Sequence, residues 1–234
     1  MNLIEYADRD MLAIDLANIL AGNLKQALLH HDTASLAVPG GTTPGAVFDA
    51  LCAADLDWER VNVLPTDERW VAPDHERSNA GLIGRRLLTH RAAAARFLPL
   101  YAPAARPEDV LPEIEAMLAP ELPLSVLLLG MGADGHTAGL FPGCDALEAD
   151  PGRLVSMSED PTGVAPYRRM TMTPGGIARA TTVVITVSEA DRADALSAIA
   201  AGADLPAGRI TAGRVVWLVH PSAASGLPQG SQSR

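Results

Sequence analysis

A run of apolar residues that ends in a glycine-rich turn constrains the fold of this chain most strongly. The segment reads LLLGMGADGHTAGLFPG and extends from Leu127 to Gly143. Uninterrupted apolar residues are typical of a parallel strand that is buried on both faces. In open α/β sheets, ligands bind beyond the carboxyl ends of such strands. The turn that carries Asp134 and His136 is therefore the first place to expect chemistry.

The composition suits a chain that buries a full hydrophobic core. Of the 234 residues, 48% are hydrophobic and 20% are charged, as expected for one α/β domain. We expect this domain to cover residues 1–224. The last ten residues, 225–234, have little to bury and are rich in Ser, Gly and Gln, so we expect a disordered tail there.

Several classes of protein are disfavoured. No stretch reaches the roughly 18 consecutive apolar residues of a membrane span, and the N-terminal MNLIEYADRD lacks the pattern of a signal peptide. We therefore expect a soluble, cytoplasmic protein. The net charge of −10 argues against a general nucleic-acid binder. Cys52 and Cys144 have no partner spacing and no two histidines have ligand spacing, so we expect neither a disulfide framework nor a metal.

Apolar runs alternate with helical patterns along the chain, which is typical of a mostly parallel sheet covered by helices. The expected strands are 35–38, 61–64, 97–101, 126–130, 153–157, 182–187 and 215–219. The expected helices are 8–30, 44–53, 79–90, 107–118 and 189–200.

One strand end leads into a segment suited to binding an anion. In PGGTTP, the glycines Gly40 and Gly41 allow a tight turn, and Thr42 precedes a helix that begins near Pro44. Such a loop can present amides at the positive end of a helix. An ordinary strand-to-helix loop has the same composition, and both interpretations remain open at this point.

In TDERWVAPDHERSNAGL, the charged residues Asp67, Glu68 and Arg69 follow a strand. A substrate crevice or a solvated surface would explain them equally. Ser78 and Asn79 have the residue types of a helix cap.

The turn after the long apolar run matches the G-x-G-x-x-G expression through its glycines Gly130, Gly132 and Gly135. A dinucleotide site would also need a long helix that starts at the third glycine, whereas Phe141 and Pro142 interrupt any such helix. We therefore expect no nucleotide cofactor. A histidine held on an uncrowded turn beside a carboxylate can instead act as a general base.

A further segment, YRRMTMTPGG, places Arg168 and Arg169 at the start of an alternating strand, and Thr173 and Pro174 then begin a short helix. Either arginine could bind an anion in a bidentate manner. A solvent-facing pair would have the same sequence.

Together, PGGTTP, TDERWV with SNAGL, GMGADGHTAGLFPG and RMTMTP resemble the 6-phosphogluconolactonase family, within the larger group of sugar-phosphate isomerases and deaminases. The resemblance extends over nearly the whole chain, to about Val219. It implies a Rossmann-like sheet with helices on both faces, no cofactor, and hydrolysis of 6-phospho-D-glucono-1,5-lactone in the pentose phosphate pathway. The implied partner is this small sugar-phosphate lactone, and we expect a monomer or a small homo-oligomer.

The resemblance also implies roles for particular residues. His136 is the base that activates water, and Asp134 is its neighbour. The sugar-phosphate pocket contains Gly40, Gly41, Thr42 and Arg69, with Asp67 at its rim and Arg169 on the phosphate. The choice of Arg169 over Arg168 rests on the alignment with the family strand alone.

Two alternatives remain. Glucosamine-6-phosphate deaminases resemble this chain but carry a glutamate shortly after the histidine, and residues 137–142 contain no acid here. A non-catalytic sugar-phosphate sensor would keep the pocket without the chemistry. Two departures from the family pattern also stand out. Arg192 occupies a position where relatives commonly have lysine, and Val219 and His220 stand where an acid is usual.

Overall fold

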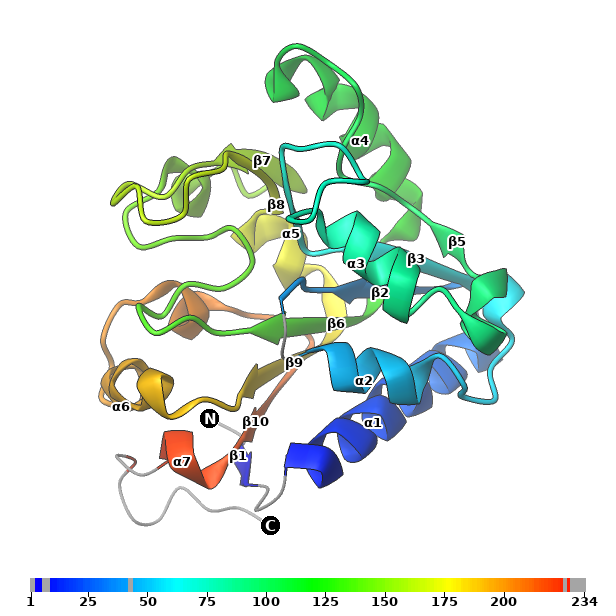
Figure 1. Ribbon diagram of the computed structural model, residues 1–234, viewed down its shortest axis with the longest axis horizontal. Helices are drawn as coiled ribbons and strands as arrows, with labels where there is room; N and C mark the ends of the chain where they lie inside the picture. The colour runs from blue at the N-terminus through cyan, green and yellow to red at the C-terminus, as the bar shows by residue number, and fades with distance from the viewer. Residues whose placement is uncertain (1–2, 6–8, 42–43, 225–226, 228–234) are drawn as a thin grey trace.

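The computed structural model describes residues 3–5, 9–41, 44–224 and 227 (Figure 1). The strands are β1 (Leu3–Glu5), β2 (Ala34–Val38), β3 (Val61–Pro65), β4 (Asp67–Arg69), β5 (Arg96–Phe97), β6 (Leu124–Gly130), β7 (Val155–Ser158), β8 (Arg169–Met172), β9 (Ala180–Val187) and β10 (Arg214–Val219). The α-helices are α1 (Arg9–His30), α2 (Pro44–Leu51), α3 (Asn79–Arg86), α4 (Leu111–Leu118), α5 (Pro174–Ala178), α6 (Ala193–Ala200) and α7 (Pro221–Ala224). No helix in these ranges combines the length and apolarity needed to cross a membrane.

Two sheets organise the molecule. The larger has seven strands in the order β1-β10-β9-β6-β2-β3-β5, and every neighbouring pair is parallel. The smaller has three antiparallel strands in the order β4-β8-β7. The expected mostly parallel α/β architecture is confirmed.

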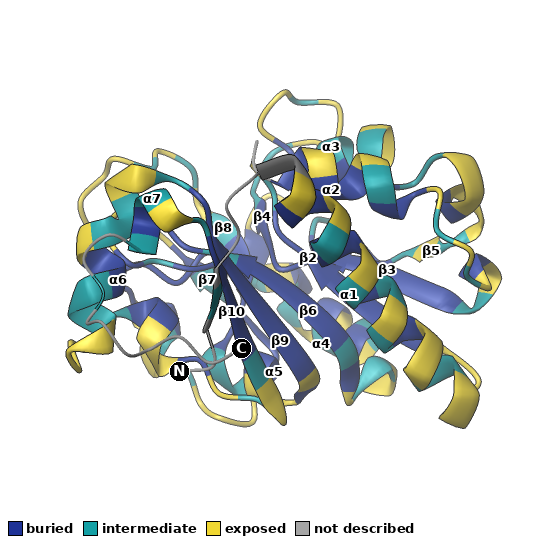
Figure 2. Ribbon diagram, turned by 90° about the horizontal axis from the view of Figure 1, so that it is seen from below, coloured by how far each residue is buried: buried dark blue, intermediate teal, exposed yellow. Residues whose placement is uncertain are grey.

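Helices cover both faces of the parallel sheet, as expected. Side chains of β6 alternate between two core clusters, with Leu127 and Leu129 in one and Val126 and Leu128 in the other. The first cluster includes residues of α4, α6 and the small sheet, and the second includes residues of α1, α2 and α3. Figure 2 shows the central strands as buried ribbons between these layers. Burial on both faces explains why the strands are apolar throughout.

Some expected boundaries are wrong. The expected strand 97–101 is only Arg96–Phe97, because Pro99 lacks the N–H that would continue the ladder. The expected helix 79–90 ends at Arg86, and the helices expected from 107 and 189 begin with 3₁₀ turns, Pro107–Val110 and Ala190–Arg192. The strands β1 and β4 were not expected as separate elements.

The expected strand 153–157 belongs to the small sheet and not to the parallel one. It corresponds to β7, which pairs antiparallel with β8. A parallel neighbour would require a crossover connection, whereas the loop between β7 and β8 only reverses the chain. Two strands of the small sheet, β7 and β8, come between β6 and β9 in the chain, whereas its third strand, β4, follows β3. The small sheet packs on one side of the parallel sheet.

The order of strands reverses between β2 and β6. From β2 the chain continues to β3 on one side, whereas from β6 it reaches β9 on the other side. Connections that leave in opposite directions expose a crevice at the carboxyl ends of the two strands. The segments after β2 and β6 are PGG and MGADGH, which are two of the sequence motifs.

The strand β6 provides a test of the core. Leu127 is fully buried, so Leu127→Ala removes buried methyl groups and leaves a cavity. We expect the free energy of unfolding to fall by about 2–5 kcal/mol, measured by urea denaturation. Leu29→Ala is the control, because Leu29 is 71% exposed. An equal effect of both substitutions would contradict the packing described.

Candidate active site

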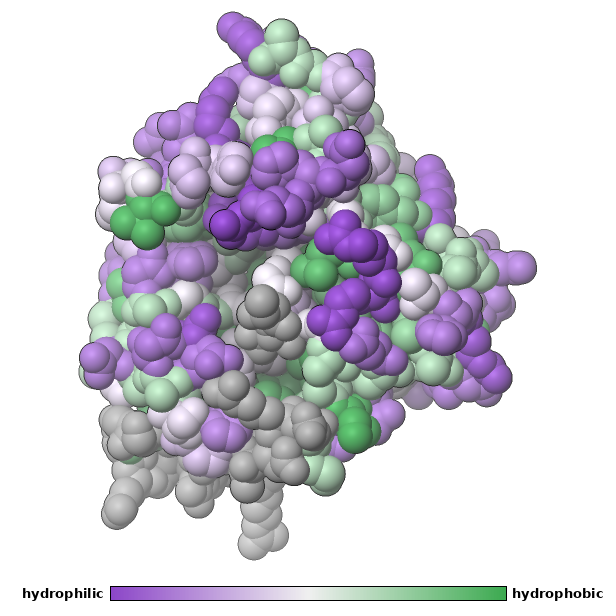
Figure 3. Space-filling model, viewed as in Figure 1, coloured by the Kyte–Doolittle hydropathy of each residue, from purple (hydrophilic) through white to green (hydrophobic). Residues whose placement is uncertain are grey.

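A cleft of about 690 Å³ lies at the crevice between β2 and β6. It is lined by residues that follow both strands, by residues of α1, α2 and the small sheet, and by residues that follow β9. On the face shown in Figure 3, hydrophilic side chains border a hollow near the middle of the molecule. The cleft brings together Gly40, Gly41, Asp67, Arg69, His136 and Arg169.

Hydrogen bonds within the turn after β6 stabilise its conformation. Gly132 N donates to His136 O at 2.8 Å, and Thr137 Oγ1 donates to Gly130 O at 2.7 Å. Gly135 has a φ of +79°, which favours glycine. A Cβ on Gly132 would overlap the His136 ring and the Asp134 carboxylate. This glycine therefore allows the two side chains to lie against the backbone.

Asp134 and His136 form a pair at the cleft. Asp134 Oδ1 lies 2.5 Å from His136 Nδ1 and also accepts from His136 N at 3.1 Å. A carboxylate oxygen can only accept, so Nδ1 carries the proton and Nε2 of the neutral ring keeps its lone pair. The side chain of His136 is 32% exposed. The pair can therefore accept a proton from a molecule in the cleft.

The loop after β2 contributes backbone to the same cleft. Gly41 has a φ of +97°, and Gly40 lies against the side-chain amide of Asn79, where a Cβ would overlap it. Both glycines line the cleft. Thr42 lies outside the described residues, so its expected place in the pocket stays a prediction.

Asp67 and Arg169 form a buried ion pair across the small sheet. Arg169 Nη1 donates to Asp67 Oδ2 at 2.8 Å, and their side chains are 12% and 4% exposed. Asp67 is therefore buried and does not lie at an open rim, which corrects the expectation. Asp67 is the first residue of β4, which comes directly after β3 in the chain and pairs with β8. Among the described residues, Arg169 Nε has no hydrogen-bond acceptor.

Arg69 lies beside this pair. Its Nη1 donates to Asn79 Oδ1, and Asn79 Nδ2 donates to the carbonyl oxygen of Asp67 at 2.7 Å. Burial lowers the pKa of Arg69, and the Asp67 carboxylate opposes this shift. The guanidinium groups of Arg69 and Arg169 therefore lie near each other at the cleft, together with the carboxylates of Asp67 and Glu68.

Arg168 points to different partners. Its guanidinium pairs with Glu108 and Glu159, and it is not among the residues that line the cleft. The adjacent residue on the strand, Arg169, is the one at the cleft. This alternation follows from the period of two in β-strands.

Glu68 secures the start of α3. Its carboxylate accepts from the backbone N of Arg69, Asn79 and Ala80 and from Ser78 Oγ, at 2.7–3.1 Å. Ser78 also caps the helix by accepting from Gly81 N, as its residue type predicted. Burial raises the pKa of Glu68, and the hydrogen bonds oppose this shift. Sequence reasoning left Glu68 without a role because three of its four donors are ten or more residues away.

Three more residues of the cleft were not chosen as site residues from the sequence. Arg192 Nε donates to Met131 O at 2.7 Å, and Asn79 and Glu189 also line the cleft. Arg192 was noted only as a departure from the family pattern, and Asn79 only as a helix cap. The sequence offered one indication that these residues belong to the site, which is their position at the end of a predicted strand or at the start of a predicted helix.

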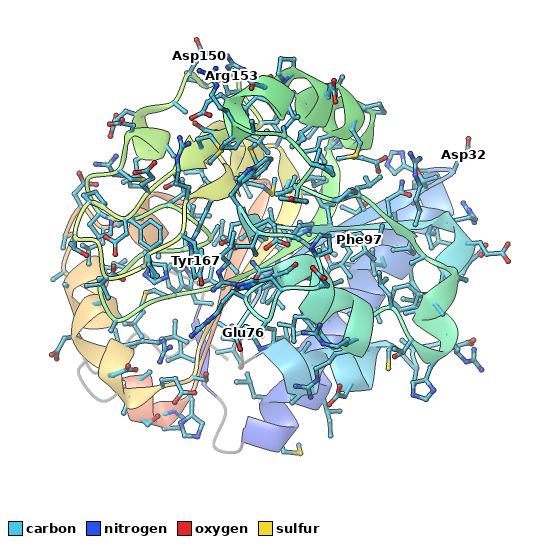
Figure 4. All side chains as sticks on the ribbon, turned by 45° about the horizontal axis from the view of Figure 1, so that its top comes forward. Asp32, Glu76, Phe97, Asp150, Arg153 and Tyr167 are labelled. Atoms are coloured by element: carbon cyan, nitrogen blue, oxygen red, sulfur yellow. The ribbon has the colours of Figure 1, made fainter. Side chains whose placement is uncertain are left out.

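The loops before α3 and before β8 meet beside the cleft residues. Trp70 N donates to Arg168 O at 2.8 Å, and the rings of His75 and Tyr167 lie 5.8 Å apart. Figure 4 shows Tyr167 and Glu76 on these two loops. Within the described ranges, no group of three or more His, Cys, Asp or Glu residues could hold a metal ion.

Comparison with known proteins agrees with this geometry. The family model described as glucosamine-6-phosphate isomerases/6-phosphogluconolactonase matches residues 7–217. The chain belongs to this family.

Relatives within this family include a 6-phosphogluconolactonase of Pseudomonas putida, which is 37% identical over 86% of this chain and 84% of the relative. A 6-phosphogluconolactonase of Mesorhizobium japonicum is 47% identical over 61% of this chain and 60% of the relative. The crystal structure of a 6-phosphogluconolactonase from Shewanella baltica superposes on this chain with a TM-score of 0.85. The two sequences are 27% identical, and the match covers 93% of this chain and 97% of that one. The resemblance stated from the sequence motifs is thereby confirmed.

The Glu68 network provides a test of how the site is held in this family member. In the wild-type protein, the Glu68 carboxylate accepts hydrogen bonds from backbone N–H groups. In Glu68→Gln, the side-chain NH₂ group would face some of these donors and could not accept from them. We expect the free energy of unfolding to fall by about 1–3 kcal/mol, because buried donors lose their acceptor. Chemical denaturation measures this loss, and Glu76→Gln on the exposed loop is the control. Equal stability of the two variants would show that Glu68 does not secure α3.

Proposed function

We propose that this chain is a 6-phosphogluconolactonase, which hydrolyses 6-phospho-D-glucono-1,5-lactone to 6-phospho-D-gluconate in the pentose phosphate pathway. One observation carries the proposal: His136, which is paired with Asp134, and Arg169 line one cleft. A base and an anion site in one cleft match a substrate that carries a lactone carbonyl and a phosphate. The family membership and the names of the relatives support the same reaction.

In this proposal His136 is the general base. Its Nε2 takes a proton from water while the water oxygen bonds to the lactone carbonyl carbon. The proton then passes to the ring oxygen as the carbon–oxygen bond of the lactone breaks, so one water is consumed and the acid is released. Asp134 holds Nδ1 and stabilises the imidazolium that forms between the two transfers. Backbone amides of the turn or an arginine would stabilise the oxyanion.

Arg169 holds the phosphate, with Arg69 and Arg192 adding positive charge nearby. Gly40 and Gly41 bring the backbone of the loop after β2 close to the substrate, and Thr42 belongs to the same pocket. Asp67 acts through Arg169, because its carboxylate orients the guanidinium. A planar guanidinium suits the oxygens of a phosphate, since it can donate two parallel hydrogen bonds.

A glucosamine-6-phosphate deaminase is the second candidate, because two more carboxylates, Asp67 and Glu189, line the cleft. Ring-opening chemistry requires further acid/base groups. Asp67, however, is already paired with Arg169, and residues 137–142 place the Phe141 ring beside His136 and contribute no carboxylate. A sugar-phosphate sensor would bind 6-phosphogluconate tightly without turnover, and the retained Asp134–His136 pair argues against it.

We further propose a cytoplasmic enzyme that uses no cofactor, binds neither nucleic acid nor membranes, and acts as a monomer or a small homo-oligomer. One catalytic domain over residues 1–224 is part of this proposal. The tail expected over 225–234 lies outside the described residues, except for Leu227.

Lactone hydrolysis tests the function directly. Wild-type protein should accelerate the opening of 6-phosphogluconolactone, generated in place, above its spontaneous rate. His136→Ala should lose about 10²- to 10⁴-fold in kcat, because it removes the base. His30→Ala, on an exposed position of α1, is the control. If folded wild type does not accelerate the reaction, the proposal is wrong, and deaminase substrates and 6-phosphogluconate binding should then be measured.

Gly132→Ala tests the geometry of the pair without removing either side chain. The added Cβ would overlap the His136 ring and the Asp134 oxygen, so the ring must move. We expect kcat to fall by about 10²-fold, because small misplacements of a reacting group are costly. Gly22→Ala is the control, since its Cβ would meet nothing within 4 Å. Wild-type kcat in folded Gly132→Ala would contradict the proposed role of the turn.

A further inference from the structure

We propose that Phe141 is a positioning residue that holds the general base and the phosphate-binding arginine in a fixed relation to each other. The inference rests on the proposed function, since it concerns how the base and the anion site of that reaction are aligned. It concerns a side chain that carries no polar group and does not line the cleft.

Phe141 contacts both functional groups. The centroids of its ring and of the His136 imidazole lie 5.0 Å apart with the planes tilted by 39°. The Arg169 guanidinium carbon lies 5.0 Å from the same Phe141 centroid. One aromatic ring therefore joins a group on the turn after β6 to a group on the small sheet.

Each functional group needs this second contact. The hydrogen bond that His136 Nδ1 donates to Asp134 Oδ1 fixes one atom of the ring, but a single bond leaves the ring free to tilt about it. The Arg169 guanidinium is held by Asp67 through Nη1, while its Nε has no acceptor among the described residues. A cation over an aromatic face is attracted to the ring, and more strongly where water is excluded. The ring thus restrains both groups without using the atoms that act on substrate.

Phe141 is itself rigidly placed. It is 2% exposed and belongs to the core cluster that includes α4 and the small sheet. The backbone just before it is bonded to the small sheet, because Gly139 N donates to Thr171 Oγ1 at 3.0 Å and Gly139 O accepts from Ser158 Oγ. The Phe141 ring could therefore move only if the contact between Gly139 and the small sheet moved with it. The distance between base and arginine is therefore set by core packing.

The test compares Phe141→Leu with Phe48→Leu. Phe48 is also buried, at 0% exposure, but it belongs to the other core cluster on α2. Both substitutions remove a ring from the core, so both should lower the midpoint of urea denaturation. Only Phe141→Leu should change the kinetics, measured well below the unfolding midpoint of each variant.

The expected kinetic result separates the two contacts. For 6-phosphogluconolactone, kcat/KM of Phe141→Leu should fall by about tenfold to a hundredfold through a higher KM and a lower kcat, because arginine and base are both displaced. For gluconolactone, which has no phosphate, only kcat should fall. Phe48→Leu should match wild type with both substrates.

Binding of inorganic phosphate, measured by calorimetry, gives a readout that is independent of turnover. Phe141→Leu should raise the dissociation constant for phosphate by about fivefold to thirtyfold, as expected for loss of a desolvated cation–π contact. Phe48→Leu should leave it unchanged, and Arg169→Gln should abolish binding.

Three results would overturn the proposal: phosphate affinity and kinetics of Phe141→Leu within twofold of wild type, equal kinetic losses in Phe48→Leu, or no phosphate binding by wild type. If wild type does not hydrolyse the lactone, the proposed function fails, while the phosphate measurement still decides whether Phe141 positions Arg169.

Discussion

The reversal of strand order between β2 and β6 is the constraint on which the site depends. The connections that follow these two neighbouring strands leave in opposite directions, and the cleft lies at the carboxyl ends of both. Into this cleft the chain places two glycine-rich segments and the edge of a small antiparallel sheet. The large sheet supplies the rigid support, because its strands are buried on both faces and cannot shift without disturbing two core clusters.

The small sheet supplies the charges. Its antiparallel pairing sets Arg69 opposite Arg169 in register, and the carboxylate of Asp67 on β4 accepts a hydrogen bond from Arg169 on β8. Arg69 and Arg169 lie close enough for their like charges to repel, although the carboxylates of Asp67 and Glu68 lie near them. An anionic ligand, as the proposed function requires, would offset this repulsion even though the protein as a whole is acidic. Local geometry, and not net charge, determines what this cleft attracts.

Direct contacts join the turn that carries His136 to the small sheet that carries Arg69 and Arg169. Gly139 lies so close to Thr171 that a Cβ would crowd it, and its amide bonds the threonine hydroxyl. The Phe141 ring lies against both His136 and Arg169. Preorganisation of this kind is effective because the groups need no rearrangement when substrate binds.

The sequence by itself determined the class of fold, the order of most strands and helices, and the turn with Asp134 and His136. These features follow from local chemistry: apolar runs bury as strands, glycines permit tight turns, and a histidine two residues after an aspartate can reach it. Ordered motifs also indicated the family.

Only the tertiary structure decided which arginine faces the cleft, that Asp67 is buried in an ion pair, and that Glu68 holds the start of α3. It also placed β7 in the small sheet and Phe141 between two functional groups. Ser78 and Glu68 are 10 positions apart, and Arg169 and Asp67 are 102 positions apart. The pairing of such distant segments depends on how the sheets pack, which no local pattern specifies.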